Sequence, residues 1–214
     1  MSELEIVTIP NGQFLQNCYL LADPDRGEAV VVDPGEEWER ILAELDRRGW
    51  RTTAIWLTHA HLDHVLGLAE VRKATGAPVW LHPAERPVYD GVPQQGLWFG
   101  LPLAPLPPPD EAFREGEPVR VGHHEFKVLF TPGHSPGSVC LVGEGIVLAG
   151  DVLFAGSIGR TDLPGGDHST LLASIRRELL TLPDATRVLS GHGPETTIGV
   201  ERASNPFLTG AAIG

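Results

Sequence analysis

The sequence predicts a protein of the α/β class that folds as one domain. Short apolar segments rich in Val, Ile and Leu recur along both halves of the chain, and amphipathic helical patterns separate them. A chain of 214 residues is long enough to bury a large core without disulfides. Its composition, 42% hydrophobic and 21% charged, is typical of a compact globular protein. We therefore expect a single domain over residues 1–214.

Nine segments have the length and composition of β-strands. They are residues 4–9, 18–22, 29–32, 54–57, 79–81, 126–130, 139–142, 146–149 and 187–190. Three helices are expected between them. The clearest begins at Trp38, has apolar residues at spacings of three and four, and ends at Gly49, a residue type favoured after a helix C-terminus. The others are expected over residues 65–75 and over residues 170–180, the latter with Ser169 as its N-cap.

Residues 91–110 differ from the rest of the chain in composition. Six prolines stand there beside the apolar run from Leu97 to Leu101. Proline removes backbone donors and fixes φ, so the segment is expected to be a covering loop rather than a strand. Its aromatic side chains either line a substrate cleft or pin the loop to the core, and the sequence leaves both interpretations open.

Charge and composition argue against several classes of partner. The chain has 16 Lys and Arg against 28 Asp and Glu, a net charge of −12, so we expect no nucleic-acid partner. No apolar run is long enough to cross a bilayer, and the acidic N-terminus does not resemble a secretion signal, so a cytoplasmic protein without membrane contact is expected. Cys18 and Cys140 lie in apolar stretches and are expected to be buried hydrophobic side chains. The oligomeric state is not indicated.

A cluster of histidines follows the predicted strand 54–57. Three of the nine histidines fall within the run Thr-His-Ala-His-Leu-Asp-His of residues 58–64. If the chain stays extended, His59 and His61 point the same way, and the turn into the next helix aims Asp63 and His64 at a neighbouring point. Imidazole nitrogens and carboxylate oxygens bind zinc, and similar sets suit iron or manganese. This one loop is therefore able to start two metal sites.

Three further candidate ligands stand where an apolar strand meets a glycine-bearing loop. They are His134, Asp151 and His192. So many imidazoles and carboxylates in one place repel each other or stay unpaired unless a cation organises them, so the sequence predicts a metal centre. The remaining histidines have no such partner set and are expected at the surface or behind the ligands: His82, His123, His124 and His168.

Five motifs occur along the chain in a fixed order. They are Val32-Asp33-Pro34-Gly35, Thr58 to His64, Thr131 to Gly137, Ala149-Gly150-Asp151 and Ser190 to Gly193. With these motifs the chain resembles the metallo-β-lactamase superfamily over nearly its whole length. The resemblance implies an αββα sandwich of two mixed β-sheets flanked by helices, with a two-metal site at one edge. It implies that His59, His61 and His134 hold one ion, that Asp63, His64 and His192 hold the other, and that Asp151 bridges both. Aspartate stands where many true β-lactamases have cysteine, which argues against antibiotic hydrolysis.

Within the superfamily, residues 150–162 are similar to the glyoxalase II-like hydrolases, which cleave acylated glutathione thioesters. This similarity implies two divalent ions, zinc first with iron or manganese as alternatives, and attack by a metal-bridging hydroxide with Asp63 and Asp151 in catalytic positions. A small thiol-derived substrate is expected. Arg160 and Asp162 replace the glutathione-binding Lys and Tyr of those enzymes. Arg160 is our candidate for a substrate carboxylate, with a surface ion pair as the alternative.

Two other functions remain open from the sequence. The run Gly159-Arg160-Thr161-Asp162 also resembles the persulfide dioxygenases of the superfamily, which use one iron held by two His and one Asp. That resemblance implies His59, His134 and Asp151 as the iron ligands. The continuation over residues 163–167 favours the hydrolase. A metal-binding protein without turnover is the third interpretation, because fold does not determine function.

Overall fold

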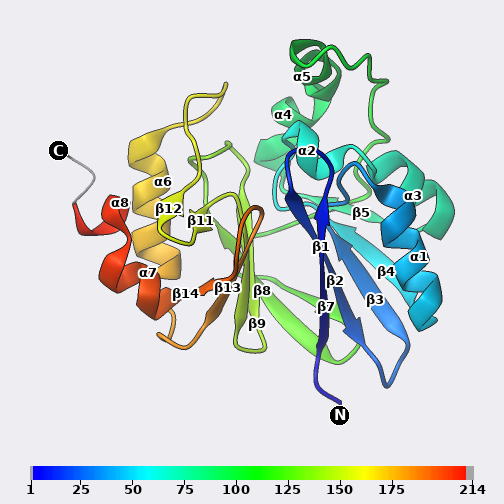
Figure 1. Ribbon diagram of the computed structural model, residues 1–214, viewed down its shortest axis with the longest axis horizontal. Helices are drawn as coiled ribbons and strands as arrows, with labels where there is room; N and C mark the ends of the chain where they lie inside the picture. Colours follow the sequence, from blue (N-terminus) through cyan, green and yellow to red (C-terminus); the bar gives the residue numbers. More distant parts are fainter. Residues whose placement is uncertain (1, 211–214) are drawn as a thin grey trace.

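The computed structural model describes residues 2–210 and shows two mixed six-stranded sheets packed face to face, with helices on their outer faces (Figure 1). The first sheet has the order β1 (Glu5–Asn11), β2 (Gln16–Asp23), β3 (Glu28–Val32), β4 (Arg51–Trp56), β5 (Val79–Leu81) and β6 (Glu111–Ala112). The second has the order β14 (Thr196–Thr197), β13 (Arg187–Ser190), β10 (Ile146–Gly150), β9 (Val139–Gly143), β8 (His124–Phe130) and β7 (Pro118–Val121). A short hairpin joins β11 (Leu153–Phe154) to β12 (Ser157–Ile158). The predicted αββα sandwich is confirmed.

Helices cover both outer faces of the sandwich. The first sheet is covered by α1 (Trp38–Arg48) and α3 (Leu68–Thr75), and the second by α6 (His168–Ser174), the π-helical turn Ile175–Leu179, α7 (Ile198–Ser204) and α8 (Pro206–Thr209). Side chains alternate along the strands, so each buried strand supplies two cores. In β2, Leu20 packs toward α1 and α3, whereas Leu21 packs between the sheets. The same alternation in β10 sends Leu148 between the sheets and Val147 toward α6.

Two of the predicted helices differ from expectation in their boundaries. The helix predicted over residues 65–75 is divided into α2 (Leu62–Val65) and α3, with Gly67 between them. A β-carbon on Gly67 would overlap the backbone oxygen of Gly35, so the chain bends where the two loops touch. The third helix begins at His168, because Asp167 rather than Ser169 accepts the Thr170 N–H (2.7 Å). Helix α1 ends at Arg48, and Gly49 follows it in the left-handed conformation, so the predicted end of this helix is confirmed.

The proline-rich segment 91–110 is only partly a loop. Helix α4 (Arg86–Asp90) precedes it, and α5 (Val92–Trp98) occupies its first part. The expectation of a loop is therefore wrong for residues 92–98, since Pro93 lies in the first turn of α5, where the missing N–H costs nothing. Three leucines of the extended chain that follows pack against the core between the first sheet and helices α1 and α3: Leu101, Leu103 and Leu106. Trp98 and Phe99 stay about half exposed, at 53% each, near the site described below.

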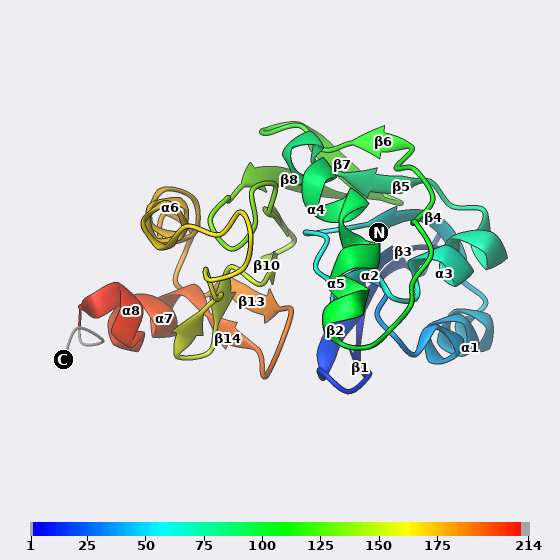
Figure 2. The ribbon, with the colours of Figure 1, turned by 90° about the horizontal axis from the view of Figure 1, so that it is seen from above.

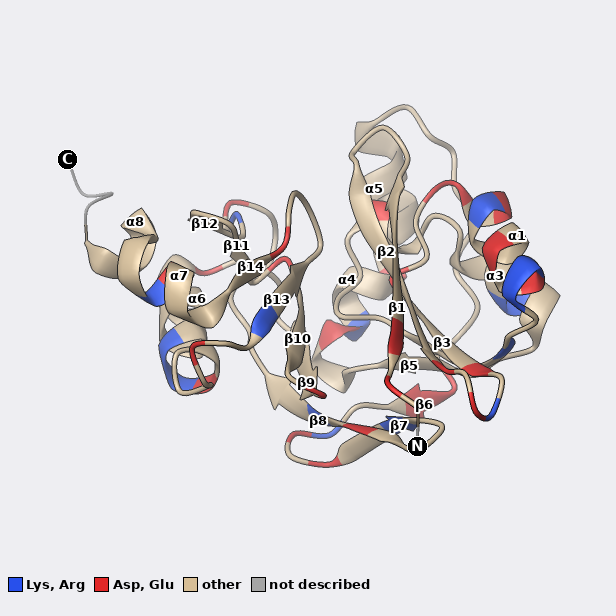
Figure 3. Ribbon diagram, turned by 60° about the horizontal axis from the view of Figure 1, so that its bottom comes forward, with Lys and Arg blue, Asp and Glu red and all other residues tan. Residues whose placement is uncertain are grey.

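The remaining surface is mixed in charge. Acidic and basic residues intermingle along α1 and α3 (Figure 3), and Glu44 of α1 pairs with both Arg47 and Arg48. Both cysteines are buried and free, as predicted. Among residues 2–210, no helix is both long and apolar enough to span a membrane.

Candidate metal centre

The seven predicted ligands converge at one end of the sandwich, where loops of both sheets meet. The segment after β4 supplies four of them, His59 and His61 from its loop and Asp63 and His64 from helix α2. The loops after β8, β10 and β13 supply one each: His134, Asp151 and His192. Seen from above, the ends of β10 and β13 face α2 across this edge (Figure 2). Among the described residues, two clusters able to hold an ion consist entirely of predicted ligands, one of His59, His61 and His134 and one of Asp63, His64 and His192. A third cluster joins Asp33 to His59 and His64.

The first group brings together three imidazoles whose facing ring nitrogens do not all have a proton to share. His134 Nε2 lies 3.2 Å from His59 Nε2 and 2.7 Å from His61 Nδ1. His134 donates its Nδ1–H to the Arg160 carbonyl (2.8 Å), so its Nε2 carries a lone pair. His59 Nδ1 faces Thr58 Oγ1 (3.1 Å), whose proton goes to Asp33, so His59 Nε2 also carries a lone pair. Two lone pairs at this distance repel each other unless a cation lies between them.

The second group is oriented in the same way. His64 Nδ1 donates to Asp33 Oδ2 (3.0 Å), and His192 Nδ1 donates to the Phe14 carbonyl (3.1 Å). Both Nε2 atoms then point inward, and His192 Nε2 lies 3.0 Å from Asp63 Oδ2. Such outer hydrogen bonds fix the tautomer and direction of a metal-binding imidazole. Within the described residues, the buried His64 Nε2 has no hydrogen-bond partner.

Asp151 stands between the two groups. Its Oδ1 lies 3.3 Å from His64 Nε2, and its Oδ2 lies 3.7 Å from His134 Nε2 and 3.6 Å from His192 Nε2. The carboxylate therefore reaches ligand atoms of both groups. Gly191 makes room for it, because a β-carbon there would overlap Asp151 Oδ1. Among the described residues, Asp151 Oδ1 is also buried without a hydrogen-bond partner. A buried imidazole nitrogen and a buried carboxylate oxygen without hydrogen-bond partners are suitable ligand atoms for a divalent metal ion.

The electrostatics of the site distinguish its two sides. Burial and the neighbouring imidazoles lower the pKa of His59 well below its usual value, and burial with His134 lowers the pKa of His61 to about 3. These imidazoles are neutral at pH 7, as metal binding requires. On the other side, burial opposes the effect, but Asp151 and Asp63 raise the pKa of His64 well above its usual value. Against the effect of burial, His64 and its neighbours lower the pKa of Asp151. The carboxylates thus stay ionised and attract positive charge.

Asp33 is a supporting residue to which the sequence analysis assigned no role. It follows β3 with a positive φ of 50°, a strained conformation for a residue other than glycine. Its Oδ1 accepts the Thr58 N–H (2.7 Å), and its Oδ2 accepts the Thr58 hydroxyl and His64 Nδ1. One carboxylate therefore fixes the start of the ligand loop and a ligand within it. The motif containing Asp33 was recognised, but its partners are distant in sequence.

Two further buried residues, Glu85 and Gln95, hold the ligand loops from outside. Glu85 Oε1 accepts the Ala60 N–H (3.0 Å), while its Oε2 accepts the Gly137 N–H (2.6 Å) and the Ser135 hydroxyl (2.8 Å). Gln95 Oε1 accepts the Leu62 N–H (3.0 Å). Glu85 therefore ties the loop of His59 and His61 to the loop of His134. Both are single polar residues in helical segments, so no local sequence pattern identifies them.

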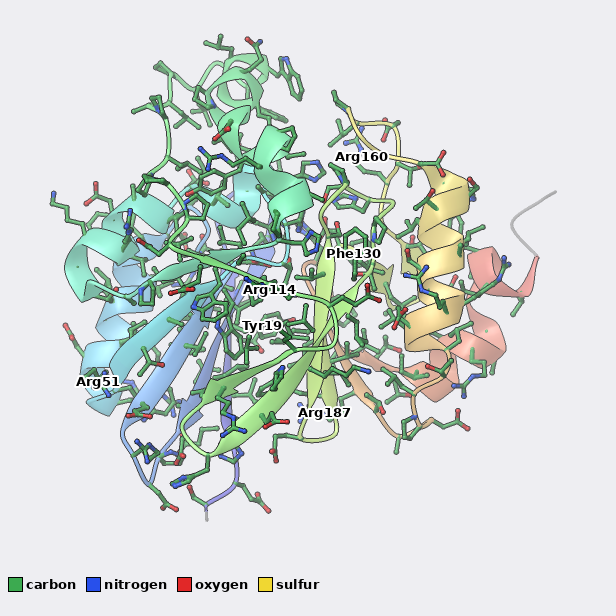
Figure 4. All side chains as sticks on the ribbon, turned by 180° about the vertical axis from the view of Figure 1, so that it is seen from behind. Tyr19, Arg51, Arg114, Phe130, Arg160 and Arg187 are labelled. Carbon is green, nitrogen blue, oxygen red and sulfur yellow. The ribbon has the colours of Figure 1, made fainter. Side chains whose placement is uncertain are left out.

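A cavity of about 420 Å³ opens over the predicted ligands. Aromatic side chains border it, among them Phe14, Trp98, Phe99 and Phe154. The aromatic residues after position 97 therefore line a cleft, which decides between the two interpretations of that segment. Among residues 2–210, Arg160 is the one Lys or Arg side chain that lines this cavity, and it lies at the edge flanked by α5 and α6 (Figure 4). Arg160 is exposed and forms a two-pronged pair with Asp162 (both 2.7 Å).

The other four histidines lie outside this cavity. His82 stacks on Phe130 (4.4 Å between ring centres), His123 bonds to Asp23 (2.7 Å) and His168 begins α6. His124 is buried in β8 rather than at the surface, because its side chain faces inward in the alternation of that strand. None of the four touches a predicted ligand through a hydrogen bond in the described part of the chain.

Comparison with known proteins agrees with this geometry. Residues 11–192 match the metallo-beta-lactamase superfamily. The chain belongs to the metallo-β-lactamase superfamily. A hydroxyacylglutathione hydrolase, GloC, of Haemophilus influenzae is 39% identical over 209 residues, which cover 96% of this chain and 98% of that protein. The names of such relatives indicate a metallo-hydrolase.

Solved structures of the superfamily are similar over almost the whole chain. A crystal structure of BLEG-1, described as a B3 metallo-beta-lactamase, has a TM-score of 0.90 and 44% identity and covers 96% of this chain and 100% of its own. TTHA1623 in a di-iron-bound form has a TM-score of 0.86 and 43% identity, with coverages of 94% and 100%. ETHE1 from Myxococcus xanthus has a TM-score of 0.80 and 30% identity, with coverages of 96% and 85%. The di-iron structure and the clusters described above together support divalent metal binding.

Proposed function

We propose that this superfamily member is a dinuclear metal-dependent hydrolase of small thioesters. The observation that carries the proposal is the position of Asp151, whose two oxygens face ligand atoms of both groups. Seven ligands with one shared carboxylate exceed what a single four-coordinate ion accepts. We assign His59, His61 and His134 to one ion, Asp63, His64 and His192 to the other, and Asp151 to both. Zinc is the first candidate, with iron or manganese as alternatives.

The chain's own residues prepare the site for acyl transfer. When bound, the divalent ions supply activated water at neutral pH and positive charge for a developing oxyanion. His59 and His134 stay neutral and point their Nε2 lone pairs inward, because their Nδ1 atoms are held by Thr58 and the Arg160 carbonyl. Asp63 faces the cavity, with its Oδ2 3.0 Å from His192 Nε2, so it is placed to orient the attacking water.

A thioester suits this site because it needs no separate acid. A thiol with a pKa of about 8.5 leaves readily as thiolate, whereas an amine or alkoxide requires a proton. Of the described Lys and Arg side chains, Arg160 is the one that lines the cavity, and its planar fork matches a carboxylate. A substrate carboxylate would replace Asp162 on Arg160 with little change in pairing, so we expect this contact to contribute modestly.

A persulfide dioxygenase is the second candidate, favoured by the similarity to ETHE1. In that case His59, His134 and Asp151 would hold a single iron. Four of the seven residues then have no assigned role, although Asp33 and the Phe14 carbonyl orient two of them: His61, Asp63, His64 and His192. We therefore rank the dinuclear hydrolase first.

The two functions differ in the substrate that is consumed and in whether the reaction requires oxygen. Metal-replete protein is assayed with acyl-glutathione, with acyl esters of small thiols, with glutathione persulfide and with a β-lactam, in air and anaerobically. The β-lactam is included because BLEG-1 is described as a B3 metallo-beta-lactamase. We expect thiol release from thioesters at equal rates with and without oxygen. Oxygen uptake with the persulfide and no thioester cleavage would replace the hydrolase with the dioxygenase.

A further inference from the structure

A second cavity of about 370 Å³ adjoins the metal cavity on the side of His61. Helices α4 and α5 form one wall, and the segment Leu163 to Gly165 together with Pro136 forms the other. We call this cavity the α5 groove. Four side chains line both cavities: His61, Gln95, Trp98 and Leu163. A substrate held at the metals therefore has direct access to the α5 groove.

The lining of the α5 groove is apolar. Its walls include Pro87, Val88, Pro136 and Pro164, and among residues 2–210 no Asp, Glu, Lys or Arg side chain lines it. One of its polar groups, the Gln95 side chain, is fully occupied. Its oxygen accepts from Leu62, and its nitrogen donates to the carbonyls of Ala60 (3.3 Å) and Val88 (3.1 Å).

Gln94 is the remaining amide along the groove. It is exposed on α5 and makes no side-chain hydrogen bond within the described residues. It therefore stands at the rim, where a bound chain would pass it without displacing any internal bond. A charged group would lose its hydration in the groove without gaining a partner, whereas an alkyl chain would leave water at no such cost.

We propose that the α5 groove binds the uncharged acyl chain of the thioester, while the thiol portion lies in the metal cavity near Arg160. This inference rests on the proposed function. The charges of the two cavities determine which end of the substrate each one binds. Arg160 lines the metal cavity and not the groove, so a charged thiol portion finds a partner only in the metal cavity. The scissile carbonyl then lies between them, beside His61 and the other ligands. The preferred substrates are medium-chain or branched acyl thioesters of small, carboxylate-bearing thiols.

The test is a series of acyl thioesters of one thiol, N-acetylcysteine, from acetyl to hexanoyl. Each buried methylene contributes about 0.8 kcal/mol, or roughly fourfold in kcat/KM. Four added methylenes should therefore raise kcat/KM by roughly 200-fold. A parallel series of acetyl thioesters varies the thiol instead, from ethanethiol to hexanethiol. The proposal predicts that kcat/KM depends much less on the length of the thiol than on the length of the acyl chain.

Variants on α5 locate the effect. Gln94→Glu should reduce the hexanoyl-to-acetyl ratio of kcat/KM by about threefold or more, because the chain then passes an ion. Gln94→Leu should raise the same ratio. Leu97→Glu is the matched control: Leu97 is an exposed residue of the same helix that lines neither cavity, so its ratio should stay at the wild-type value. Equal effects of Gln94→Glu and Leu97→Glu would overturn the assignment.

Binding without turnover separates this inference from the proposed function. Ketone analogues, with CH₂ in place of the thioester sulfur, are titrated into metal-loaded protein by calorimetry. Tighter binding with longer acyl chains supports the groove even if no thioester is cleaved, an outcome that would refute the hydrolase. Thioester hydrolysis with no dependence of kcat/KM or Kd on acyl length would retain the hydrolase and overturn the groove.

Discussion

Replacing Glu85 with Gln tests whether one buried carboxylate positions both halves of the first ligand group. Glu85 accepts three hydrogen bonds, from the backbone N–H groups of Ala60 and Gly137 and from the Ser135 hydroxyl. Glutamine has nearly the same shape, but one end of its amide is an NH₂ group without a lone pair. Whichever way the amide turns, that NH₂ faces a backbone N–H. The variant therefore leaves at least one buried donor without an acceptor.

The expected loss follows from that unpaired donor. A buried donor left without a partner costs about 1 to 3 kcal/mol of unfolding free energy. In a domain of this size, about 2 kcal/mol corresponds to a decrease in Tm of roughly 4 to 8 °C. Because Glu85 joins the loop of His59 and His61 to that of His134, we also expect metal affinity to fall by about 10 to 100-fold.

Thermal unfolding and competitive metal titration measure these two quantities. Glu115→Gln is the matched control, since Glu115 is exposed and makes no side-chain hydrogen bond among the described residues. It should behave as wild type in both assays. A Glu85→Gln protein with unchanged Tm would refute the hydrogen-bond argument. A lower Tm with unchanged metal affinity would show that Glu85 stabilises the fold without positioning the ligands.

Three further predictions concern the same site. Asp151→Ala should lower kcat/KM far more than Arg160→Ala, because Asp151 is the carboxylate shared by both groups and Arg160 makes only a substrate contact. Equal losses of kcat/KM in steady-state assays would contradict these roles. Lactoyl-glutathione should be hydrolysed with a high KM, since Asp162 beside Arg160 repels an acidic tripeptide, and saturation at low micromolar substrate would refute this. Burial raises the pKa of Glu85 from 4.5 to about 7, so between these pH values the folded protein holds a proton that the unfolded chain has released. In urea unfolding, the stability of wild type relative to Glu85→Gln should therefore fall as pH rises through this range, and a constant difference would contradict the raised pKa.

The convergence of the candidate ligands could be predicted from the sequence because their signals are local. His59 to His64 lie within one strand-to-helix turn, and His134, Asp151 and His192 each follow an apolar strand. Strand ends on one side of a sandwich meet at one edge, so recognising the strands was enough to bring these residues together.

The supporting residues could not be predicted in the same way. Glu85 and Gln95 act through partners 25 to 52 and 7 to 35 positions away, and neither belongs to a periodic pattern. Helix α5 was missed because six prolines suggested a loop, although proline is tolerated in a first helical turn. The division between α2 and α3 depends on contact of Gly67 with Gly35, which is tertiary and leaves no local signal.

The metal content of the replete protein tests the central claim most directly. After loading with excess zinc, and separately with iron, followed by removal of free metal, elemental analysis should give close to two equivalents per chain. Asp151→Ala should retain less than wild type, because it loses the ligand that faces both groups. A stable single equivalent in wild type, under both loading conditions, would contradict the dinuclear account and favour the one-iron dioxygenase.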